Sequence, residues 1–96
     1  MNEYEVLLVV DGVNEKIPFE KYLKKEGFLA IEGEDFAYQG RAHLPLMNTR
    51  AYIFDVLKKA LKLSHEKTCK FICKLGENPL ESYEFVEKDK DFRQII

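Results

Sequence analysis

The sequence predicts a single α+β domain, and three observations support this prediction. The chain of 96 residues has the length of one compact domain and is too short for two separate cores. Short stretches of branched and aromatic residues, typical of strands, alternate with two stretches whose apolar residues recur at helical spacing. Apolar residues make up 46% and charged residues 33% of the chain, which is typical of folded rather than disordered proteins.

The first strand and the first helix follow from the N-terminal quarter of the chain. Residues 4–10 (YEVLLVV) are too few for a buried helix and are rich in β-branched side chains, so they predict a strand covered on both faces. Asp11 and the glycine after it end this strand. Residues 14–28 predict a short helix, with Pro18 in its first turn and Gly27 as its C-terminal stop. The buried stripe of this helix is predicted to be Phe19, Tyr22 and Leu23.

A hairpin is predicted next. Residues 28–33 (FLAIEG) and 36–44 (FAYQGRAHL) read as two strands joined by a turn, and Gly40 is expected to mark a bulge. Period-two alternation sends the side chains of the later strand to two faces of the sheet. Phe36, Tyr38, Ala42 and Leu44 belong to one face, and Ala37, Gln39, Arg41 and His43 to the other.

The second helix and the last strands complete the pattern. A helix over residues 48–61 is predicted, with Asn48 as its N-cap and an apolar stripe at helical spacing. The stripe consists of Ile53, Val56, Leu57, Ala60 and Leu61. Residues 68–75 (TCKFICKL) predict a fourth strand, and residues 82–87 a possible short fifth one.

The resulting order β-α-β-β-α-β is the split βαβ pattern of ferredoxin-like folds. This fold has a four-stranded antiparallel sheet with both helices on one face. We therefore expect one ferredoxin-like domain over residues 1–87, followed by a charged tail over residues 88–96.

The second face of such a sheet is open, and alternation predicts what lies there. Leu7, Val9 and Ile72 form an apolar stripe on it, and large apolar side chains are costly to expose, by about 1.5–3 kcal/mol each. A second copy of the chain is the simplest cover, so these three residues are the predicted dimer interface.

The net charge and the targeting signals bear on the partners and on the cellular compartment of this protein. The formal net charge is only −2, so no global field draws the chain to nucleic acid or to an anionic membrane. Residues 50–76 alone carry +5, which indicates either an anion-binding patch or ordinary solvated lysines. The sequence has no apolar run long enough for a membrane span and no secretory signal, so we expect a cytoplasmic protein without membrane contact.

Two cysteines raise the question of a disulfide or a metal site. Cys69 and Cys73 lie four strand residues apart, roughly 13 Å, whereas a disulfide needs Cα atoms about 4.4–6.8 Å apart. A pair of this spacing without a second Cys or His pair is not a zinc signature. We expect both to be buried core thiols.

Three polar residues could carry chemistry. Asp11 ends a central strand, where a carboxylate could serve as a general base or as a ligand of a divalent metal such as Mg²⁺, although Asp-Gly is also a common turn pair. Arg41 and His43 share a strand face and could hold a phosphate and shuttle a proton, or could be ordinary polar residues of an open face. No phosphate loop, nucleotide fingerprint or nucleophile elbow is present.

The order of elements, together with VLLVVDG (6–12), the Gly-Phe pair at 27–28, FAYQG (36–40) and NTRAYIFDVLKKAL (48–61), resembles the VapD-type virulence-associated ribonucleases. These are related to the small ferredoxin-like CRISPR adaptation proteins. The resemblance implies a homodimer with its sheets packed face to face, in which the fifth strand helps to complete the partner's sheet and Asp11 lies near its symmetry mate. The glycine directly after Asp11 and the net acidic charge depart from what such a nuclease needs.

Two functional hypotheses follow. The first is a dimeric endoribonuclease with Asp11 and His43 as catalytic residues and with RNA on Arg41, Lys70 and Lys74. The second is a non-catalytic homodimeric module. It would bind either a protein partner, through an acidic C-terminal segment with Phe92, Ile95 and Ile96, or a small regulatory ligand. The substrate class and the partner depend on which hypothesis holds.

Overall fold

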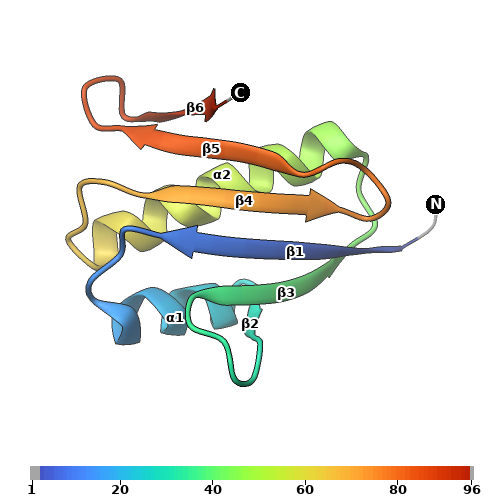
Figure 1. Cartoon of the computed structure of the whole chain (residues 1–96), viewed down its shortest axis with the longest axis horizontal. Helices are drawn as coiled ribbons and strands as arrows, with labels where there is room; N and C mark the ends of the chain where they lie inside the picture. The colour runs from blue at the N-terminus through green and yellow to red at the C-terminus, as the bar shows by residue number, and fades with distance from the viewer. Residues whose placement is uncertain (1–2, 96) are drawn as a thin grey trace.

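The computed structural model describes residues 3–95, which form an α+β fold of two helices and one six-stranded antiparallel sheet (Figure 1). The strands lie in the order β2-β3-β1-β4-β5-β6, and the two helices lie together behind the sheet in Figure 1. The elements are β1 (Tyr4–Asp11), α1 (Lys16–Lys25), β2 (Leu29–Ala30), β3 (Ala37–Ala42), α2 (Leu46–Leu63), β4 (Lys70–Leu75), β5 (Glu81–Val86) and β6 (Asp91–Ile95).

Strand β1 lies between β3 and β4 and has two different faces. Val6, Leu8 and Val10 point toward the helices and are at most 4% exposed, whereas Leu7 and Val9 point away and are 38% exposed. Strand β4 alternates in the same way. The predicted assignment of side chains to the two faces is therefore confirmed for these strands.

The core fills the space between the sheet and the helices. Helix α1 contributes Phe19 and Leu23 as predicted, while Tyr22 of the expected stripe is only partly buried. All five residues predicted for the stripe of the second helix are buried in α2. Within the described range 3–95, neither helix is both long and apolar enough to cross a membrane.

Local sequence signals predict the C-terminus of α1 correctly but not the N-terminus of α2. Gly27 ends α1 as predicted: it has φ +99°, and the N–H of Phe28 donates to the carbonyl of Leu23, which is a Schellman closure. The predicted N-cap of the second helix, Asn48, is wrong. Helix α2 begins at Leu46 after Pro45, because the carbonyl of Pro45 already accepts the N–H of Thr49.

Strand β2 is shorter than predicted, and no bulge occurs in β3. Phe28 turns into the core, so only Leu29 and Ala30 pair with β3 instead of residues 28–33. Pairing of β1 with β3 runs without interruption past Gly40. A Cβ at Gly40 would lie 3.0 Å from the carbonyl oxygen of Gly27, so this glycine allows a close approach of two chain segments.

The C-terminal segment belongs to the sheet, so the prediction of four strands and a possible fifth is wrong. Strand β5 pairs with β4 of its own chain, and part of the predicted tail (88–96) forms β6 on its outer side. Phe92 of β6 packs 5.0 Å from Phe71 and 5.5 Å from Phe54, measured between ring centroids. Phe92 therefore packs within the fold of its own chain, and Ile96 lies outside the described residues.

We expect Leu8→Ala to lower the free energy of unfolding by about 2–5 kcal/mol, because Leu8 is fully buried at the centre of the sheet. Leu7→Ala is the matched control: the same change one residue away on the exposed face should cost about 1 kcal/mol. Urea unfolding at low protein concentration measures both. Equal losses would contradict the assignment of the two faces.

Candidate functional site

The open face of the sheet, defined as the side chains that point away from both helices, carries most of the predicted site residues. Cross-strand pairing places Val9 opposite Ile72 and Asp11 opposite Lys70 on this face. His43 lies just beyond the end of β3. The predicted site residues within strands on this face are Leu7, Val9, Asp11, Arg41, Lys70, Ile72 and Lys74.

An apolar strip runs across the middle of the open face. Leu7, Val9 and Ile72 are 38%, 38% and 41% exposed, and Ile95 of β6 extends the strip at 36%. The small side chain of Ser82 lies between Ile72 and Ile95 in the cross-strand register. A hollow of about 180 Å³ opens at this place. Sequence reasoning missed Ile95 as a face residue because it assigned this segment to a tail.

Charged side chains border the strip as pairs of opposite sign. At one end Asp11, Lys70, Glu84 and Arg93 follow one another across four strands, and Arg93 contacts Glu84 at 3.2 Å. At the other end Arg41 lies 3.4 Å from Glu3 and 3.6 Å from Glu5. The acids on this face are Glu3, Glu5, Asp11 and Glu84, and the bases are Arg41, Lys70, Lys74 and Arg93. The predicted basic patch of Arg41, Lys70 and Lys74 is therefore embedded among four acids.

The two predicted catalytic residues lie at opposite ends of the sheet within one chain. Pairing places Ala42 opposite Tyr4, at the start of β1, while Asp11 ends the same strand. The seven residue-to-residue steps from Tyr4 to Asp11 span about 23 Å at roughly 3.3 Å each. Asp11 and His43 of one chain therefore share no site, whereas Asp11 and Lys70 are brought together.

Asp11 is also a candidate metal ligand. Among residues 3–95, no group of three or more His, Cys, Asp or Glu side chains could hold a metal ion. Gly12 has φ +91°, as expected of a residue that turns the chain after a strand. Both cysteines are free and buried, as expected, and burial raises the pKa of each thiol to about 12.

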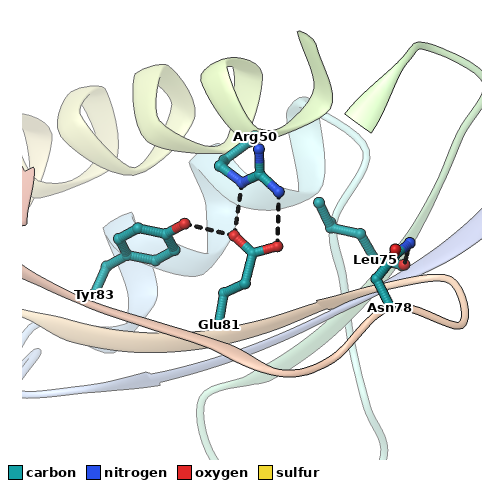
Figure 2. Close-up of polar contacts among 5 residues, drawn as sticks. All are labelled: Arg50, Leu75, Asn78, Glu81 and Tyr83. Atoms are coloured by element: carbon teal, nitrogen blue, oxygen red, sulfur yellow. Dashed lines mark hydrogen bonds and ion pairs between the residues drawn. The ribbon is translucent and has the colours of Figure 1, made fainter. Parts of the chain in front are cut away.

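The least exposed ion pair of the described chain lies on the other side of the sheet, between α2 and β5 (Figure 2). The guanidinium of Arg50 donates two hydrogen bonds to the carboxylate of Glu81, at 2.6 and 2.8 Å. The hydroxyl of Tyr83 donates to the same carboxylate. The Arg50 guanidinium holds the pKa of Glu81 below its usual range, while burial and the bond to Glu81 raise that of Tyr83 to about 12. Every group of this cluster is paired, so it serves to attach β5 to α2.

Comparison with protein-family models, with curated proteins and with solved structures found no match to this chain. The resemblance to the VapD-type ribonucleases therefore stays a prediction from the residues quoted above.

Glu81→Gln should lower the free energy of unfolding at pH 7 by roughly 1–3 kcal/mol, because it removes a charged hydrogen-bond partner of Arg50. A carboxylate with a lowered pKa stabilises the fold above its unfolded-state pKa and loses this contribution as the pH falls through its folded-state pKa. The deficit of Glu81→Gln should therefore shrink when urea unfolding is repeated under acidic conditions. Glu87→Gln, at an exposed carboxylate, is the control. A deficit independent of pH would contradict the role assigned to Glu81.

Proposed function

We propose that this chain is a non-catalytic homodimeric interaction module whose open sheet face is the contact between two copies. The apolar strip of Leu7, Val9, Ile72 and Ile95 carries this proposal. Two copies related by a two-fold axis would cover each other's strip with the same residues. We further propose that β1 to β4 with the two helices form a ferredoxin-like core, which the order β2-β3-β1-β4 supports.

The energy balance favours a dimer that depends on protein concentration. Full burial of a large apolar side chain contributes about 1.5–3 kcal/mol, so a side chain already more than half buried has about 1 kcal/mol left to gain. Eight such side chains in a symmetric dimer would contribute roughly 5–10 kcal/mol, against an association cost of about 4–15 kcal/mol. The two terms are similar in size, so we expect reversible self-association.

The charges of the open face favour a protein surface over a polyanion. Acids and bases are equal in number there, and most stand opposite each other across neighbouring strands. Binding of RNA depends mainly on neutralising phosphates with unpaired cations, and Arg41 is already engaged by two acids. Two near-neutral faces, in contrast, do not repel each other.

The endoribonuclease is the second candidate, and one observation favours it. Asp11 and Lys70 stand side by side at a strand end and line the same two surface hollows, of about 250 and 180 Å³. A carboxylate beside an ammonium group could activate a hydroxyl and bind a phosphate. Within one chain, His43 lies too far from Asp11 to take part in this ribonuclease site.

In light-scattering measurements over a range of concentrations, the native chain should approach twice its monomer mass. Val9→Asp should keep it monomeric, because it places a charge at the centre of the apolar strip. The control is Ile17→Asp on α1, where the side chain is 82% exposed and faces away from the sheet. This variant should dimerise as the native chain does. A native chain that stays monomeric, or a dimer that survives Val9→Asp, would overturn the proposal.

The interaction module assigns no reaction to Asp11, so the native chain and Asp11→Asn should both leave labelled RNA intact in the presence of Mg²⁺. Gel analysis of the RNA products, with His43→Ala as a third sample, distinguishes the interaction module from the ribonuclease. Mg²⁺-dependent cleavage that is lost in Asp11→Asn and kept in His43→Ala would replace our proposal with the ribonuclease centred on Asp11 and Lys70.

A further inference from the structure

A cavity of about 220 Å³ lies on the helix side of the sheet, between the end of α1, the first half of α2 and the end of β3. This is the side of the sheet behind which both helices lie in Figure 1. An apolar cavity of about 150 Å³ is large enough to hold benzene. The space therefore suits a small organic molecule with one ring.

Small residues keep this space open. Gly40 and Ala42 of β3 pair with Val6 and Tyr4 and line the cavity together with Gly27. Gly27 has φ +99°, a backbone conformation that favours glycine, and a Cβ there would meet no atom within 4 Å. A Cβ at Gly40 would lie 3.0 Å from the carbonyl oxygen of Gly27. The same backbone geometry that closes α1 and brings it against β3 thus excludes side chains that would fill the cavity.

The walls of the cavity are apolar and include two aromatic rings. Phe28 after α1 and Tyr52 of α2 line it, with their ring centroids 6.3 Å apart and their planes at 28°. Val6 of β1 and Leu44 after β3 add aliphatic surface. Aromatic rings attract one another in offset and edge-to-face contacts beyond what their buried area contributes. These walls favour an aromatic ligand.

Three polar side chains of the lining already have partners within the chain. The hydroxyl of Tyr52 donates to the carboxylate and to the backbone carbonyl of Glu26, at 2.9 and 3.0 Å. The hydroxyl of Thr49 shares a hydrogen bond with that of Tyr4. The guanidinium of Arg41 lies on the open face, against acids of that face. Because a charge is costly to bury in an apolar site without a free partner, these contacts favour an uncharged ligand.

We propose that this cavity binds a small neutral aromatic molecule of about the size of a substituted benzene. Its ring would pack against Phe28 and Tyr52 and contact Val6 and Ala42. The burial of apolar surface supplies the affinity, so we expect a dissociation constant of about 0.1–1 mM for a ligand with seven non-hydrogen atoms.

This site stands independently of self-association, because the apolar strip of the open face contributes no residue to the cavity. Ligand binding can therefore be tested in Val9→Asp, whatever the oligomeric state of the native chain. Failure of one proposal leaves the other intact.

Two-dimensional NMR titration of the full chain with toluene, benzylamine and benzoate tests the proposal. The three probes share one ring and nearly one size, but toluene is neutral, benzylamine is a cation and benzoate is an anion. Toluene should shift the amide signals of Gly27, Phe28 and Gly40, which line the cavity. Each charged probe should bind at least about tenfold more weakly than toluene, because its charge would lose water without gaining a free partner.

Ala42→Leu provides the matched variant, because a larger side chain at this position would occupy the cavity. It should weaken toluene binding at least about tenfold. Ala51→Leu, the same change at an exposed position of α2 outside the cavity, should leave binding unchanged. Tyr52→Leu, at a side chain that is 40% exposed, removes one ring of the wall and should weaken toluene binding about 2–10-fold.

Three results would overturn the proposal. The first is that toluene shifts no amide signal of the cavity. The second is that benzylamine or benzoate binds as tightly as toluene. The third is that Ala42→Leu and Tyr52→Leu, each folded as judged by its NMR spectrum, bind toluene as tightly as Ala51→Leu does.

Discussion

The two-faced character of the central strand β1 is the constraint on which the rest of the structure depends. With β3 and β4 on its two sides and the helices behind it, every second side chain of β1 must be buried, and the others must form the open face. A shift of one residue would exchange the two sets, placing Glu5 and Asp11 in the core. The same register places Asp11 opposite Lys70 and Glu5 opposite Arg41, so it also decides which charges on the open face can neutralise each other.

The C-terminal hairpin of β5 and β6 changes which side chains the open face carries. Its attachment rests on aromatic packing around Phe54, on the Arg50–Glu81–Tyr83 cluster, and on an ion pair of 2.8 Å between Lys58 and Asp91. Once attached, it adds Ile95 to the apolar strip and places Glu84 and Arg93 in line with Lys70. A basic edge strand thereby becomes an interior strand with acids beside it. This is the physical reason for preferring a protein contact to RNA on the open face.

The candidate site divides into two regions at the two ends of β1, and they differ in kind. The Asp11 end is a charged border of the open face, with shallow hollows. The His43 end adjoins a mostly apolar cavity between the sheet and the helices, lined by Val6, Phe28 and Tyr52 among others. Residues that alternation assigns to one face can thus lie at sites that are far apart, because alternation determines the direction of a side chain and not its position along the sheet.

The sequence by itself determined the features that depend on neighbours in the chain. The parity of β1 and β4, the stripe of α2 and the stop at Gly27 follow from local periodicity and from the left-handed backbone that glycine adopts readily. Tertiary structure alone decided the short β2, the place of β6 and the separation of Asp11 from His43. Each of these depends on residues distant in sequence: Phe28 in the core, Phe92 against Phe54, and Ala42 paired with Tyr4. Contacts of this kind stabilise the protein only when the whole fold assembles, so no local sequence pattern predicts them.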